Sequence, residues 1–125
     1  MGLDTCASRS PADVVLTAED SAAFAAAGID LCGGIYSDGS VSIRGKVYDH
    51  LICAMAEVSL YQEWIPPEVV AEISAALDAH SAEDLAHVWD AADRFHGPHS
   101  SVETADLQTF FRLCAARGLG LIGWW

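Results

Sequence analysis

The stretch "IYSDGSVSIRGKVYDHL", residues 35–51, contains both kinds of secondary structure that decide the fold. Its first half places the turn-forming run SDGS between β-prone residues and predicts a β-hairpin over 35–43. In its second half the apolar spacing becomes that of a helix, with Val47, Leu51 and Met55 on one face. A hairpin that runs directly into a helix indicates a fold in which helices and an antiparallel sheet are combined.

Four further helices are predicted from capping signals around this stretch. They begin after Thr17, at Pro67, after Ser81 and after Ser100, and glycines follow the first and the last of them. Two arginines, Arg112 and Arg117, are expected to complement the negative end of the last helix. The terminal "LGLIGWW" is predicted to be a strand that pairs with the hairpin, with its glycines permitting close packing. We therefore expect one globular domain, residues 1–125, with an α+β fold of about five helices on a small, largely antiparallel sheet.

The charge of the chain is strongly acidic. Eighteen Asp and Glu residues face six Lys and Arg residues, which gives a formal net charge of −12 and a pI near 4.4. Such a surface repels the phosphate backbone of nucleic acids and anionic membranes, so we expect no direct contact with either. It attracts basic proteins, although solvated helix faces account for most acidic residues in proteins of this kind.

The cysteines and the N-terminal stretch predict a compartment. We expect no secretory signal, because no basic region followed by an apolar run occurs near the start, and no apolar run is long enough to span a bilayer. The four cysteines lack CxxC spacing and are expected to be reduced thiols in the cytoplasm.

No cofactor motif occurs. His96 and His99, with His87 upstream, suggest a metal site only weakly, and a loop is the favoured interpretation, so we predict no metal.

Two of the few basic residues, Arg44 and Lys46, flank Gly45 where the hairpin meets the helix. There they are placed to cradle a phosphate or carboxylate together with the first amides of the helix. The alternative is that the two cations offset nearby carboxylates such as Asp38 and Asp49, and the sequence favours this second interpretation.

Other side chains suggest weaker candidates. His50 and Cys53 share a flank of the same helix with Glu57, but their spacing on one helix suits a polar flank better than a Cys–His nucleophile. Four aromatic residues gather in "SLYQEWIPP" and at the end of the chain, namely Tyr61, Trp64, Trp124 and Trp125. We expect them mainly in the core, and the alternative is an exposed anchor for a partner.

The segments "GLDTCAS", "RGKVY", "SLYQEWIPP" and "GLGLIGWW" together resemble a group of small bacterial proteins. The resemblance spans most of the chain and is weakest over residues 78–102. That group usually carries an aromatic residue where Cys6 and Ile43 stand here. The resemblance implies no fold, activity or ligand, and it singles out Arg44, Lys46, Tyr48, Tyr61 and Trp64 as residues of the group's motifs.

Two hypotheses about function follow. The leading one is a cytoplasmic, non-enzymatic binding protein of the inhibitor or immunity type, whose acidic helix turns at 83–93 and 103–106 engage a basic protein partner. The alternative is a small-molecule site, or an enzyme, in which Arg44 and Lys46 hold an anionic group. In that alternative Tyr48 or His50 acts as acid or base, Tyr61 lies nearby, and Trp64 covers the ligand. The oligomeric state is left open.

Overall fold

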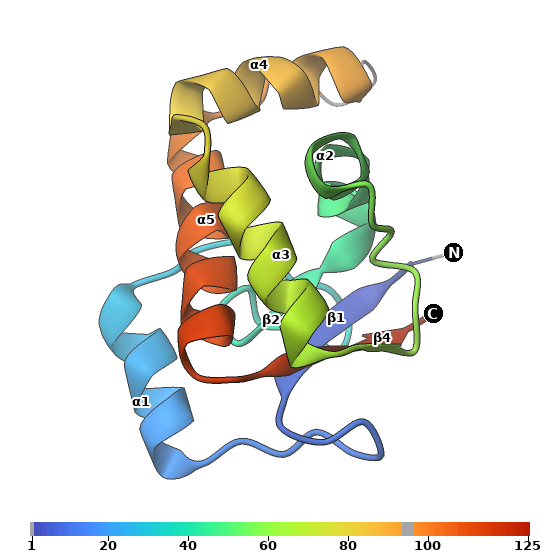
Figure 1. Ribbon diagram of the computed structural model, residues 1–125, viewed down its shortest axis with the longest axis vertical. Coiled ribbons are helices and arrows are strands. Elements are labelled where there is room, and N and C mark those ends of the chain that lie inside the picture. Colours follow the sequence, from blue (N-terminus) through green and yellow to red (C-terminus); the bar gives the residue numbers. More distant parts are fainter. Residues whose placement is uncertain (1, 94–96) are drawn as a thin grey trace.

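A computed structural model describes residues 2–93 and 97–125 of the chain and shows five helices and four strands (Figure 1). The helices are α1 (Ala18–Ala27), α2 (Gly45–Ala56), α3 (Pro67–Asp78), α4 (Ala82–Ala92) and α5 (Ser101–Ala116). The strands are β1 (Asp4–Ser8), β2 (Ser42–Arg44), β3 (Trp64–Ile65) and β4 (Gly120–Trp124). The predicted α+β fold and all five predicted helices are confirmed.

The sheet is antiparallel throughout and has the order β2-β1-β4-β3. The predicted hairpin is wrong, because residues 35–41 form no strand and β2 pairs with the N-terminal strand β1 instead. The C-terminal strand β4 exists as predicted, but its partners are β1 and β3. Neither β1 nor β3 was predicted from the sequence.

The two faces of the sheet have different surroundings. Alternation along the strands turns Ala7, Ile43 and Leu121 toward the helices, where they join the buried core. In that core α5 packs against α1, α3 and α4, and α2 packs against α3, α4 and β1. The opposite face carries Arg44, Trp64 and Trp124, among others, and we call it the open face. Figure 1 shows α4 at one end of the molecule and both chain ends beside the strands.

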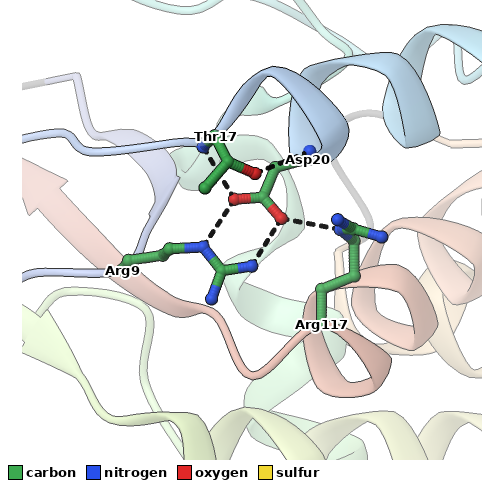
Figure 2. A network of polar contacts seen from close by, with 4 residues as sticks. All are labelled: Arg9, Thr17, Asp20 and Arg117. Carbon is green, nitrogen blue, oxygen red and sulfur yellow. Dashed lines mark hydrogen bonds and ion pairs between the residues drawn. The ribbon is translucent and has the colours of Figure 1, made fainter.

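A buried carboxylate, Asp20, ties three distant segments together (Figure 2). It completes the predicted capping box with Thr17 at the start of α1. Its two oxygens also accept hydrogen bonds of 2.7 Å from Arg9, after β1, and from Arg117, after α5. The prediction that Arg112 and Arg117 serve the end of α5 is therefore wrong, since Arg117 bonds Asp20 and Arg112 bonds Asp78 of α3.

Within the part of the chain that the structure describes, no helix is both long and apolar enough to cross a membrane.

Candidate functional site

A pocket of about 510 Å³ lies beside the first turns of α2. It collects side chains from the β2–α2 junction, the segment before β3 and the end of α4. Its lining residues are Arg44, Lys46, Val47, Asp49, His50, Tyr61 and Asp93. Four of the six residues predicted as a site, Arg44, Lys46, His50 and Tyr61, are thus brought to one cavity.

The two cations of the pocket form no ion pair with a carboxylate of the residues that the structure describes. Among the basic residues that the structure describes, Arg9, Arg112 and Arg117 form ion pairs, whereas Arg44 and Lys46 form none. Arg44 stands directly opposite Asp4 in the β1–β2 register, yet the Asp4 carboxylate accepts a hydrogen bond from Ser37 instead. No direct ion pair therefore supports local charge relief among the described residues, but Asp49 lines the same pocket, so charge relief stays a prediction.

The carboxylates that line the same pocket are engaged by protein groups. One Asp49 oxygen accepts hydrogen bonds from the backbone amide of Leu60, at 2.7 Å, and from the Ser59 hydroxyl, at 3.1 Å. Asp93 is buried and lies 3.8 Å from Nε2 of His99. Protein donors thus occupy part of both carboxylates, whereas no ion pair occupies Arg44 or Lys46 among the described residues.

The local chain geometry explains why these cations sit at a helix start. A Cβ atom at Gly45 would collide with the side chains of Thr5 and Leu3, so the absence of a side chain lets α2 begin directly against β1. The N-cap residue, Arg44, makes no side-chain hydrogen bond to the first turn, and that turn contains no acidic residue. The positive end of the helix dipole thus adds to the charge of Arg44 and Lys46.

Tyr61 supplies a further hydrogen-bond donor. Partial burial and the Asp49 carboxylate raise the pKa of the phenol, and the Arg44 charge offsets part of that rise. The hydroxyl therefore stays protonated at neutral pH. Arg44, Lys46 and Tyr61 all present N–H or O–H groups, so the pocket is suited to an acceptor such as a carboxylate or phosphate.

Two predicted site residues lie elsewhere. Tyr48 is fully buried, donates a hydrogen bond to Glu103 and accepts one from the Cys32 amide, both at 2.7 Å. Burial raises its pKa strongly, which removes it as an acid or base at this site. Trp64 is half-buried on the open face, where its indole lies over Gly120, so it does not cover the pocket.

The weaker candidates lose support as catalytic or metal sites. Cys53 contacts the Asp49 carboxylate, and partial burial and that negative charge raise the pKa of its thiol, which disfavours a thiolate. The His99 ring stacks on Trp89 with a centroid distance of 3.8 Å, and its Nδ1 lies 2.7 Å from Asp90. His96 lies outside the described residues, and among those described no three potential ligands gather at one metal site.

The terminal tryptophans correct another expectation. Trp124 and Trp125 are 43% and 52% exposed, so they do not form core.

Sequence reasoning missed the pocket residue Asp93, since it comes from a distant helix end and no local pattern links it to residues 44–61.

Comparison of the chain with protein-family models, with curated proteins and with solved structures gave no match.

Proposed function

We propose that the protein binds a small organic anion in the pocket beside α2. One observation carries the proposal: the two described cations without an ion pair line the same cavity. Arg44 and Lys46 would hold the anionic group, and Tyr61 would donate a hydrogen bond to it. Val47 and the Tyr61 ring would form an apolar wall against the apolar part of the ligand.

The overall composition strengthens this argument. Acidic residues outnumber basic ones by eighteen to six, so a cation at the surface of this protein has many potential carboxylate partners. Arg44 and Lys46, which form no ion pair within the described part of the chain, can make charge-assisted hydrogen bonds to a ligand, each of which contributes about 1.5 to 3 kcal/mol. With the cost of association included, we expect affinities in the micromolar to millimolar range, or about 4 to 8 kcal/mol.

Calorimetric titration with inorganic phosphate, phenyl phosphate and benzoate tests the proposal. We expect phenyl phosphate to bind more tightly than inorganic phosphate, because its ring contacts Val47 and Tyr61. The double variant Arg44→Ala/Lys46→Ala should lose about tenfold or more in affinity. Arg112→Ala is the matched control, since Arg112 is an exposed cation paired with Asp78 on α3, and it should bind like the wild type. Equal affinity of the wild type and the double variant for every probe would contradict the proposal.

A basic protein partner is a second candidate function, supported by the net charge of −12. The acidic helix turns at 83–93 and 103–106, predicted as its contact surface, are partly used within the molecule. Asp90 bonds His99, Glu103 accepts from Tyr48, and Asp106 accepts from the Asp30 amide. These contacts favour a docking surface for a basic protein that lies outside the two helix turns. The cytoplasmic location stays a prediction.

A further inference from the structure

A cluster of exposed aromatic and aliphatic side chains lies at the edge of the open face. Its members are Ile35, Tyr36, Tyr61, Trp124 and Trp125, which we call the aromatic face. Ile35 is 84% exposed and Tyr36 68%. Exposure of apolar side chains of this size to water is unfavourable, so their gathering at one place indicates a surface that is covered in use.

The members of the aromatic face form one continuous surface. Tyr36 meets Trp124 edge-on, with ring centroids 6.2 Å apart, and Tyr61 meets Trp125 in the same way at 5.9 Å. A hollow of about 260 Å³ is lined by Ile35, Tyr36 and both tryptophans. A larger one of about 490 Å³ extends past the tryptophans toward Pro11 and Glu63. The surface thus offers side-chain-sized recesses between rigid rings, the arrangement found at interface hot spots.

The sequence builds this surface through strand alternation. In β4, Ile122 and Trp124 point to the open face, and the register with β1 sets Trp124 beside Asp4. The residues 35–36 belong to the segment that does not form the predicted hairpin. There the Cys6 thiol hydrogen-bonds to the carbonyl of Tyr36, which brings this loop against the sheet.

The charges around the aromatic face are mostly negative. Asp4 lines the smaller hollow and Glu63 the larger one, while Arg44 is the one cation that lines either among the described residues. Burial, together with the Asp4 and Asp38 carboxylates, raises the pKa of the nearby Cys6 thiol to about 11. A second copy of the chain would bring the same acidic rim and a charge of −12, so self-association through this surface is opposed by repulsion.

We propose that the aromatic face docks a segment of a basic protein, in which apolar side chains that enter the two hollows are flanked by lysines or arginines. The apolar contacts supply the affinity, and the acidic rim selects the partner and speeds its approach. The two proposals share Tyr61 and Arg44, since Arg44 lines both the pocket and the smaller hollow. They rest on different observations, because Tyr36 and Trp124 line no part of the pocket.

Selection from a library of random 12-residue peptides, followed by NMR titration of the ¹⁵N-labelled protein, tests this proposal. We expect the selected peptides to combine aromatic or aliphatic residues with Lys or Arg, and to shift the amide signals of residues 35–36 and 122–125. Tyr36→Ser/Trp124→Ser should weaken their binding about a hundredfold, as truncation of two hot-spot residues does. Ile35→Ser should weaken it less and, at 84% exposure, leaves folding intact. Val102→Ser, which truncates a 72% exposed apolar residue on α5, is the matched control.

Three outcomes would overturn the proposal. One is that selected peptides bind the serine variants and the wild type equally. Another is that they are acidic or uncharged. The third is a concentration-dependent dimer in sedimentation experiments that Tyr36→Ser/Trp124→Ser abolishes, which would make a second copy the occupant. The variant Lys46→Ala separates the two proposals, because Lys46 lines the pocket and neither hollow, so its loss weakens phenyl phosphate binding and leaves the peptide affinity unchanged.

Discussion

Gly45 shows how one missing side chain positions the candidate site. A Cβ atom at this position would overlap the Thr5 hydroxyl and the Leu3 side chain, both buried beneath the start of α2. We expect Gly45→Ala to lower the free energy of unfolding by about 1 to 3 kcal/mol, the usual cost of overpacking, even though alanine favours helix by about 1 kcal/mol. Urea denaturation followed by circular dichroism measures this loss.

Thr5 provides the control for that prediction. Its hydroxyl is buried without a hydrogen-bond partner among the described residues, so Thr5→Ala removes an unsatisfied polar atom and should change stability little. In the double variant Thr5→Ala/Gly45→Ala, the clash with the Thr5 hydroxyl is gone while the Leu3 contact remains, so part of the lost stability should return. If the two effects are simply additive, contact between residues 5 and 45 is not the cause.

At the scale of elements, Asp20 connects α1 to the segments that follow β1 and α5. Its carboxylate accepts four hydrogen bonds, from Arg9 twice, from Arg117 and from the Thr17 amide. Asp20→Asn keeps the shape of the side chain but removes the negative charge that Arg9 and Arg117 contact directly. Removal of one partner from a buried ion pair costs 3 to 5 kcal/mol, and both arginines are partly exposed, so we expect a loss of about 3 kcal/mol in urea denaturation at pH 7.

The effect of Asp20→Asn should depend on pH in a defined direction. The hydrogen bonds from Arg9 are the largest of the causes that hold the pKa of Asp20 well below its ordinary value. A carboxylate whose pKa is depressed in the folded state stabilises the protein when the pH is above its pKa in the unfolded state, about 4. This stabilisation is lost as the pH falls toward the pKa of the folded state. The difference in stability between wild type and Asp20→Asn should therefore shrink below about pH 4. A difference that stays constant from pH 7 to pH 3 would show that the charge of Asp20 is not responsible.

The elements also show what could be predicted from the sequence. All five helices carry local signals, such as the Thr17 capping box and the proline at the start of α3, and these signals suffice without tertiary information. Strands β1 and β3 have partners far away in the chain, and β3 contains only two residues, so no alternating pattern distinguishes them. The hairpin prediction failed because β1, some forty residues earlier, takes the pairing position that a local return strand would occupy.

The candidate site, like the fold, could be predicted only in part from the sequence. Arg44, Lys46 and His50 are near neighbours in the sequence, and the start of one helix brings them together. The lack of ion pairs of Arg44 and Lys46 with the other described residues could not be foreseen. It depends on where Ser59, Leu60 and Ser37 place their donors relative to Asp49 and Asp4. Exposure of the terminal tryptophans likewise depends on which face of the sheet the helices cover.

At the scale of the whole molecule, the net charge of −12 sets the response to salt. Repulsion among eighteen carboxylates destabilises the compact state, and dissolved salt screens it. We expect sodium chloride, raised from 20 to 200 mM, to increase stability by about 1 kcal/mol, or about 4 °C in the melting temperature of a domain of this size. A decrease would mean that ion pairs such as Arg112–Asp78 outweigh the repulsion.

Phosphate at matched ionic strength distinguishes this general screening from specific binding. A ligand that binds only the folded state at ten times its dissociation constant adds about 1.4 kcal/mol of stability. Phosphate should therefore stabilise the wild type beyond chloride, and Arg44→Ala/Lys46→Ala should lose that excess. The same variant has a net charge of −14, two more negative than −12, so its response to chloride should be steeper than that of the wild type. Opposite changes in the two salts separate the pocket from the overall charge, because a variant that merely weakened the fold would shift both curves together.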